Sequence, residues 1–256
     1  MIGAAAALFG LLIGSFLNVV VHRVPRGDSV ADGRSACPAC GAQIRSRDNI
    51  PVVSWVLLRG RCRDCAAPIS RRYPLVEAGT AALFGAIGLR VGASWVLPAL
   101  LVLAAAGIAL ALIDLEVGRL PFVITVPLIG ALALLLVPAG LADGWSPGGT
   151  ALLSAAAWVA VYGGIWFATT GRGMGFGDVV LAPSLGLALG WLGWGPSLVG
   201  LLAGFGLGAL IGVALIASGR VERRAKVPFG PYMLGGAALG VFAGSTLWTG
   251  YLHLIG

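Results

Sequence analysis

Charged residues are scarce in this sequence. They make up 11% of the 256 residues, whereas hydrophobic residues make up 58%, and the mean hydropathy is +0.95. In soluble domains about a quarter of the residues are charged, so this composition excludes an ordinary soluble domain and predicts that lipid is the main solvent. A helical crossing takes roughly 20 apolar residues, so the chain has room for one bundle of about eight membrane helices and for no large separate soluble domain.

A secretory signal and an even spread of charge are also missing. No basic segment precedes the apolar run from Ile2 to Val21 and no small-residue cleavage site follows it, so we interpret the run as a retained membrane helix. The net charge is +7, and ten of the seventeen Lys and Arg lie between Arg23 and Arg72. A nucleic-acid-binding patch is one interpretation of such a cluster. In a membrane protein the basic bias of cytoplasmic loops explains it better, so we expect no nucleic-acid partner.

Apolar runs bounded by charge, proline or glycine predict eight spans. They lie near residues 2–22, 75–93, 95–114, 122–141, 150–169, 178–193, 197–217 and 231–254. Four loops would then share one side of the membrane and hold sixteen of the seventeen Lys and Arg, with only Arg90 opposite; these loops are 23–74, 115–121, 170–177 and 218–230. Because cytoplasmic loops carry the basic excess, we expect them inside and both termini outside.

The predicted fold class is therefore an all-α polytopic membrane protein in contact with lipid, with a small insert after the first helix. Its expected parts are the first membrane helix (1–22), a cytoplasmic insert (23–74) and a membrane core (75–256). Glycines are frequent within the spans, and we interpret them as helix-packing contacts and not as a nucleotide-binding loop.

All four cysteines lie in the predicted insert. Two Cys-x-x-Cys pairs, Cys37 with Cys40 and Cys62 with Cys65, are separated by twenty-one residues. This spacing is close to that of tetrathiolate zinc sites, and four protein ligands leave no open coordination position, so the predicted zinc is structural. Two disulfides or unligated thiols are the alternatives, and a reducing cytoplasm disfavours disulfides. An insert with so few bulky apolar side chains cannot form a hydrophobic core, so it needs the free energy of metal binding to fold.

Two aspartates are placed at the ends of predicted spans. Asp114 ends the third span and Asp178 begins the sixth, directly after a glycine-rich turn that contains Gly175 and Gly177. By the charge-based topology both lie at the cytoplasmic edge of the bilayer, so they can meet although sixty-four positions separate them. Two adjacent carboxylates share a proton, which lets one activate a water while the other donates to a carbonyl oxygen.

Simpler roles for these aspartates are also open. Asp178 could cap its own helix, and Asp114 could pair with Arg119. Glu116 is a competing carboxylate, but two steps along a helix it points away from Asp114. We expect it to be solvated or paired with Arg119.

Several motifs, taken in order, resemble the bacterial type IV prepilin peptidases along most of the chain. Asp114 matches the position of that family's first catalytic aspartate, and Gly175-Phe176-Gly177-Asp178 matches its Gly-x-Gly-Asp motif with the second. The other matching segments are Gly14 to Arg23 (GSFLNVVVHR), Asn49-Ile50-Pro51, Ser54-Trp55, Leu58 to Cys62 (LRGRC), Ile69 to Glu77 (ISRRYPLVE) and Pro228 to Tyr232 (PFGPY). Two positions depart from the family pattern: Val180, where a basic residue is usual, and Phe122, where Asp or Asn is frequent.

The resemblance implies an aspartic endopeptidase of a bacterial inner membrane. Its substrates would be prepilins and pilin-like secretion subunits, whose short basic leader is removed after a terminal glycine. Many members also methylate the new N-terminus with S-adenosylmethionine, an activity associated with the cytoplasmic insert, but this sequence shows no methyl-donor fingerprint and its cofactor-binding residues stay unassigned.

A function from another class is the alternative. A zinc-stapled pilus or secretion assembly factor, or a transporter with buried carboxylates as a proton relay, would also carry these features. Transporters commonly show internal repeats and interrupted helices near the midplane. The sequence has no visible repeat and its aspartates lie at predicted span ends, which argues against transport.

Overall fold

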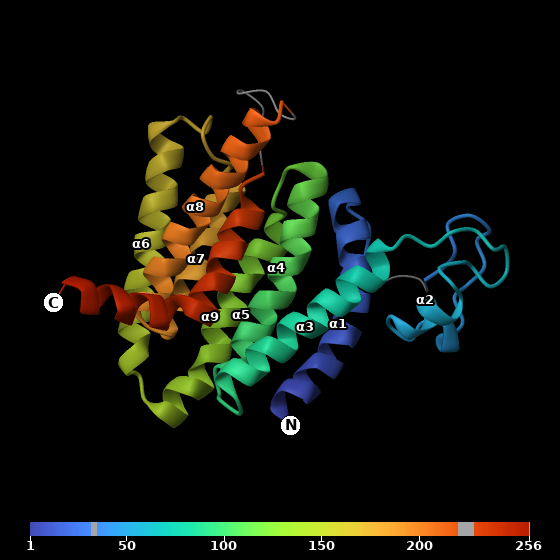
Figure 1. The fold of residues 1–256 in the computed structure, drawn as a ribbon, viewed down its shortest axis with the longest axis horizontal. Coiled ribbons are helices and arrows are strands. Elements are labelled where there is room, and N and C mark those ends of the chain that lie inside the picture. Colours follow the sequence, from blue (N-terminus) through green and yellow to red (C-terminus); the bar gives the residue numbers. More distant parts are fainter. Residues whose placement is uncertain (32–34, 220–227, 256) are drawn as a thin grey trace. The chain divides into compact units, whose positions relative to one another are not determined.

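A computed structural model describes residues 1–31, 35–219 and 228–255 of the chain (Figure 1). The predicted basic loop at 218–230 therefore falls largely outside the described residues, and Lys226 with it. Within the described ranges the regular structure is helical, and extended backbone pairs only at two isolated bridges, Ala36 with Gln43 and Arg61 with Pro68. The predicted all-α class is confirmed.

Long helices lie at each predicted span. They are α1 (Ile2–Arg23), α3 (Arg72–Val91), α4 (Leu97–Val117), α5 (Phe122–Asp143), α6 (Ser146–Ala168), α7 (Phe176–Trp191), α8 (Trp194–Ala217) and α9 (Gly230–Ile255). Among the described residues, six of them are long and apolar enough to cross a membrane: α1, α3, α4, α5, α6 and α8. The chain is thus an integral membrane protein. The other two helices are α7, which is apolar but has only 16 residues, and the 26-residue α9, so a count of eight crossings stays a prediction.

The chain divides into two compact units, Met1–Ala93 and Ser94–Gly256. In the first, α1 and α3 lie side by side (Figure 1). A Cβ atom added to Gly10 would lie 2.8 Å from the Cα of Ala81, and one added to Gly14 would lie 2.7 Å from the Cα of Glu77. Small residues let helix backbones approach closely in lipid, which explains the contact of α1 with α3.

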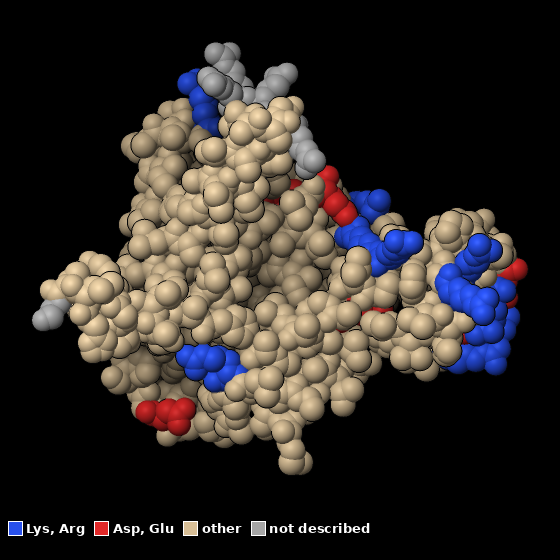
Figure 2. Space-filling view, viewed as in Figure 1, with Lys and Arg blue, Asp and Glu red and all other residues tan. Residues whose placement is uncertain are grey.

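Between α1 and α3 the chain forms the cysteine insert. It contains two short 3₁₀ turns, η1 (Val24–Arg26) and η2 (Ser46–Asp48), and one short helix, α2 (Val53–Leu57). Figure 2 shows Lys and Arg gathered over this insert, whereas the visible surface of the helices is mostly uncharged and carries a few separate charged groups. This contrast follows from the sequence, because an apolar helix surface is what lipid solvates best.

The second unit is built around two helical hairpins, α6 with α7 and α8 with α9. A Cβ atom on Gly244 would lie 2.5 Å from Pro196, and one on Gly186 would lie 2.7 Å from Ala155. Glycine is therefore the residue that brings each pair of helices together. The core of this unit includes Trp158, whose Nε1–H donates to Ser197 Oγ across 3.0 Å.

Candidate functional site

Asp114 lies in the last turn of α4. Gly118 ends the helix in the left-handed conformation (φ 64°), and its N–H donates to the Asp114 carbonyl across 2.8 Å. The Asp114 side chain is only 4% exposed. Its Oδ2 accepts a hydrogen bond of 3.0 Å from the backbone N–H of Gly230, which begins α9, 116 positions further along the chain.

Asp178 lies in the first turn of α7. Its carboxylate reaches back to the residue that precedes the helix, so that Oδ2 accepts the N–H of Gly175 across 3.1 Å. The side chain is 6% exposed. The capping alternative therefore holds in part, because Gly175 is the N-cap residue and Asp178, at the third helical position, accepts its N–H through one carboxylate oxygen.

The structure brings the two aspartates to one place in the second unit. Their carboxylates are close enough for a direct electrostatic interaction. Leu120 packs against Gly230, which binds Asp114, and against Gly177, which directly precedes Asp178: a Cβ on Gly177 would lie 2.9 Å from the Leu120 Cβ, and one on Gly230 would lie 3.1 Å from the Leu120 Cδ2. Three segments therefore surround the pair: the loop after α4, the start of α7 and the start of α9.

Aromatic side chains pack near this place. Phe122, one of the departures from the family pattern, contacts the ring of Phe176 edge-on at a centroid distance of 6.0 Å, and Phe176 contacts Trp166 at 5.3 Å. Tyr162 is fully buried on α6 and within electrostatic range of Asp178. Of these rings, Tyr162 is the buried aromatic neighbour of Asp178, whereas Phe122 and Phe176 are about half exposed.

The four cysteines converge in the first unit. Their Sγ atoms all lie within 4.8 Å of one another, and the Sγ atoms of Cys37 and Cys65 are 3.8 Å apart. A tetrahedral zinc ion with Zn–S bonds of about 2.3 Å places sulfurs about 3.8 Å apart, whereas a disulfide needs about 2.05 Å. All four cysteines are free thiols. The donor set and its spacing fit one zinc ion, so the cluster could hold the structural metal that the sequence predicted.

The two cysteine pairs share one local geometry. The N–H of Cys37 donates to the Ala42 carbonyl and that of Cys62 donates to Ala67, at the same position in each turn. Two ion pairs then connect the turns, Arg45 with Asp64 at 2.9 Å and Arg63 with Asp48 through two hydrogen bonds of 2.6 and 2.8 Å. The insert is thus held together by polar contacts around the sulfurs, in place of a hydrophobic core.

Local hydrogen bonds shift the pKa values of ionisable side chains in the insert. The N–H groups of Ala39 and Cys40 lower the pKa of the Cys37 thiol to about 7. For Cys65, the Ala67 N–H lowers the pKa, but hydrogen bonds with the neighbouring thiols outweigh it and raise the value to about 12. The Arg63 guanidinium holds the pKa of Asp48 below its usual range. Because zinc binds thiolates, its affinity for this cluster falls as the pH falls.

Sequence reasoning assigned no role to two residues that the structure places prominently. Gly230 binds Asp114, and its only sequence signal was its position in the segment Pro228 to Tyr232, which resembled a family motif. Glu77 is a buried carboxylate, 8% exposed, in the segment Ile69 to Glu77. Gly230 contacts Asp114 and Glu77 contacts Val52. Both contacts join residues far apart in the chain, so no local sequence pattern could identify them.

Comparisons with known proteins agree with the motifs. Residues 8–91 match the model of the bacterial peptidase A24 N-terminal domain, and residues 101–217 match that of the type IV leader peptidase family. A prepilin leader peptidase/N-methyltransferase of Aeromonas hydrophila is 37% identical, over 96% of this chain and 92% of that protein. Its namesake in Pseudomonas aeruginosa is 35% identical, over 97% of this chain and 93% of its own length. No solved structure matches the chain.

The two matched regions fall on the two sides of the division between the compact units, because the first ends before Ala93 and the second begins after it. The cysteine cluster lies in the first region, and both aspartates lie in the second. With identity of this level over nearly the whole length, the chain belongs to the type IV leader peptidase family.

Proposed function

We propose that this chain is an aspartic endopeptidase that removes the leader peptide from prepilins and pilin-like secretion subunits, with Asp114 and Asp178 as its catalytic pair. One observation carries the proposal: two buried carboxylates from helices α4 and α7 lie within electrostatic range of each other, and a glycine N–H holds Oδ2 of each. Buried carboxylates in lipid are costly and mark functional sites.

The geometry supports general acid–base hydrolysis. Among the described residues, the protein hydrogen bonds to these carboxylates all use Oδ2, so Oδ1 of each is left to face a water or the substrate. One carboxylate takes a proton from the water as it attacks the scissile carbonyl carbon, while the other, protonated, donates to the carbonyl oxygen. The proton taken up then passes to the leaving amine as the C–N bond breaks.

The glycines of the active-site loop have steric roles in this scheme. A Cβ on Gly177 would collide with Leu120, and one on Gly175 would lie 3.2 Å from Asp178 Oδ2. The start of α7 therefore presents bare backbone beside the carboxylates. A substrate with an apolar helix and a basic leader would dock laterally in lipid, with its junction at the interface where water is available.

The decisive experiment is a leader-cleavage assay on the purified protein. Each of Asp114→Asn and Asp178→Asn should lower cleavage by about 10²–10⁴-fold or more, because removing either member disables the pair. Glu116→Gln is the matched control, since it changes an exposed carboxylate two residues from Asp114 on the same helix. A folded, inserted asparagine variant that cleaves at the wild-type rate would establish a capping or structural role for that aspartate and favour a non-enzymatic function.

The proposal also requires a topology. The insert and the loops at 115–121 and 170–177 should face the cytoplasm, because these loops and 218–230 hold nearly all the basic residues. Reporter fusions after Arg72 and within 218–230 should both report a cytoplasmic position. Opposite sides for the two fusions would mean that the number of crossings between them is odd and that the proposed topology is wrong.

Two cofactors belong to the proposal. Zinc would be held by Cys37, Cys40, Cys62 and Cys65 and would act only through the fold of the insert. The relatives are also named N-methyltransferases, which supports a second activity on the new N-terminus. S-adenosylmethionine would supply the electrophilic methyl group for that amine.

A further inference from the structure

The short helix α2 and the residues before it carry an exposed apolar patch. Four side chains form it, each about half exposed or more: Ile50, Val53, Val56 and Leu57. Leu57 alone is 76% exposed. Positions 53, 56 and 57 share one face of a helix, so these side chains are neighbours and not scattered. Exposed apolar side chains that gather in one patch mark an interaction surface. We call these four side chains the α2 patch.

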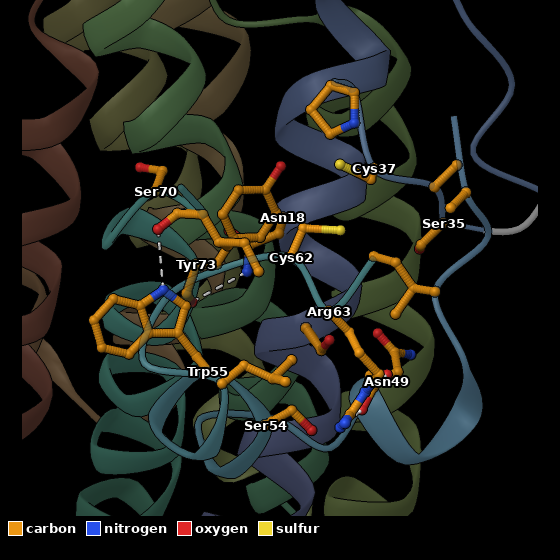
Figure 3. A pocket seen from close by; sticks show the side chains of 18 of the residues that line it. Asn18, Ser35, Cys37, Asn49, Ser54, Trp55, Cys62, Arg63, Ser70 and Tyr73 are labelled. Atoms are coloured by element: carbon orange, nitrogen blue, oxygen red, sulfur yellow. Dashed lines mark hydrogen bonds and ion pairs between the residues drawn. The ribbon is translucent and has the colours of Figure 1, made fainter. Parts of the chain in front are cut away.

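The opposite face of α2 is fixed within the first unit. Ser54, Trp55 and Leu58 line a cavity of about 650 Å³ between the insert and helices α1 and α3 (Figure 3). The Trp55 Nε1–H donates to the Ile69 carbonyl across 3.1 Å, and the Ser54 hydroxyl donates to the Arg47 carbonyl across 3.0 Å. These bonds fix the rotation of α2, so the α2 patch is held facing away from the cavity.

Two contacts place this segment beside the helices that cross the membrane. The Val52 N–H, just before α2, donates to Glu77 Oε2 on α3 across 2.6 Å. A hollow of about 300 Å³ separates Pro51 from the side of α1 that carries Leu12 and Phe16. Both α1 side chains are themselves exposed, as expected of residues that face lipid.

These contacts also give the depth of the segment. Glu77 lies five residues after α3 begins, and Phe16 lies seven residues before α1 ends. At a rise of 1.5 Å per residue, the two positions are about 8 and 10 Å inside the helix ends. The polar zone on each side of a bilayer is roughly 5–8 Å thick. The α2 patch therefore lies where the hydrocarbon core begins.

The backbone of this segment meets the requirement that lipid imposes. Hydrocarbon offers no hydrogen-bond partners, so backbone N–H groups at this depth must bond within the protein. They do so along the segment, through the N–H groups of Ile50, Val52, Val53, Ser54, Val56, Leu58, Arg59 and Gly60. Val52 adopts a φ of 61°, an outlier for a β-branched residue, while it makes its bond to Glu77. Strain of this kind persists only where surrounding contacts impose it.

The charge of the insert indicates what covers the α2 patch. Ten arginines stand against four aspartates between residues 23 and 74, and Arg47, Arg59 and Arg61 flank α2 with exposed side chains (Figure 2). Asp48 and Asp64 each form an ion pair with an arginine. An anionic lipid surface complements this charge. A basic leader peptide or a second copy of the insert would be repelled by it.

We propose that residues 50–58 are an interfacial anchor, which inserts the α2 patch into the adjacent lipid leaflet while Arg47, Arg59 and Arg61 bind anionic headgroups. Interfacial segments combine an apolar face with basic side chains in this way. The anchor fixes the cysteine insert against the membrane surface, so the insert is not wholly extramembrane. The inference goes beyond the proposed peptidase function and does not depend on it.

Lipid contact is mapped on the intact, zinc-loaded protein in nanodiscs that contain a phospholipid with a photoreactive diazirine on its acyl chain. Tryptic peptide 48–59, which carries the α2 patch, should be labelled. Peptide 35–45 is the internal control, since it belongs to the same insert, carries the exposed Ile44 and should stay unlabelled. Replacing part of the phosphatidylcholine with phosphatidylglycerol should raise labelling of 48–59 about twofold or more, and about 0.5 M salt should remove that increase.

A pair of variants tests the patch itself. Leu57→Asp should lower labelling of peptide 48–59 about fivefold or more, because lipid strongly disfavours an aspartate. Val30→Asp changes another exposed apolar residue of the insert, outside the α2 patch, and should leave this labelling as in wild type. Zinc content near one per chain verifies that each insert is folded. Asp114→Asn and Asp178→Asn should also be labelled as wild type, so the outcome is separate from that of the cleavage assay.

Each of four results would overturn the proposal. The first is wild-type labelling of 48–59 no higher than that of 35–45, which holds even where a variant folds poorly. The second is wild-type labelling in a zinc-retaining Leu57→Asp variant. The third is labelling that does not respond to phosphatidylglycerol, which would exclude anionic headgroups as the partner. The fourth is loss of the label when unlabelled prepilin is added, which would assign the α2 patch to the substrate.

Discussion

Replacing Gly230 with alanine should damage catalysis while leaving the fold in place. The Gly230 N–H holds Asp114 Oδ2 at 3.0 Å, and a Cβ added at this position would lie 2.8 Å from the same oxygen. Ordinary contact begins at about 3.4 Å. The carboxylate or the start of α9 must therefore move by about 0.6 Å, the difference between these two distances.

A shift of this size should change the stability of the fold little, but it should lower the rate of leader cleavage markedly. Misplacing a reacting group by about 1 Å can cost about 10²-fold in rate, so we expect Gly230→Ala to lower kcat for leader cleavage by roughly 10- to 100-fold. The substrate's KM should change little, because the displaced group is a catalytic carboxylate. Gly230 already lies at a helix start, and its neighbour Leu120 Cδ2, 3.1 Å from the added Cβ, can turn aside.

The assay compares Gly230→Ala with Gly206→Ala, purified in the same detergent and given the same prepilin. Gly206 is exposed on α8, and nothing described lies within 4 Å of its added Cβ, so it controls for a glycine-to-alanine change in a membrane helix. Thermal unfolding of both variants should stay close to wild type. If Gly230→Ala cleaves as fast as Gly206→Ala, the contact between Gly230 and Asp114 does not position the catalytic pair.

Three further predictions concern the cysteine insert. Metal analysis should give close to one zinc per chain, and a chelator that leaves the fold intact should not stop leader cleavage; two disulfides and no metal would contradict the zinc site. Gly41 (φ 72°) and Ala66 (φ 59°) occupy the same left-handed position after each cysteine pair. Alanine costs about 1 kcal/mol or more there, so Ala66→Gly should tighten zinc retention by about 0.5–1 kcal/mol and Gly41→Ala, which meets no steric clash, should weaken it. Equal zinc dissociation rates in the two variants would refute this reasoning. Because Arg63 depresses the pKa of Asp48, their ion pair stabilises the insert above the ordinary carboxyl pKa of about 4, and that stabilisation is lost as the pH falls through the depressed value. Asp48→Asn should therefore make the insert more sensitive to limited proteolysis at neutral pH, with the difference from wild type vanishing in acid; a difference that persisted in acid would rule out the ion pair as its cause.

Helix positions and the metal cluster follow from local patterns. Each apolar run predicted from hydropathy is a helix, because a backbone in lipid must satisfy its hydrogen bonds within itself. The cysteine spacing predicted the cluster, since each Cys-x-x-Cys turn places two sulfurs together through short-range geometry. The shortest predicted span, 178–193, corresponds to the 16-residue α7.

The sequence by itself determined where the helices lie, which four sulfurs could bind metal, and that one aspartate lies at the end of a helix and another at the start of a helix on the side expected to be cytoplasmic. Only the tertiary structure decided that the Gly230 N–H binds Asp114, that Leu120 packs against both Gly177 and Gly230, and that the Glu77 carboxylate accepts the Val52 N–H. Local patterns depend on neighbours a few positions apart, whereas these contacts depend on how closely glycine-lined helices pack, and that is fixed by every helix of the unit together.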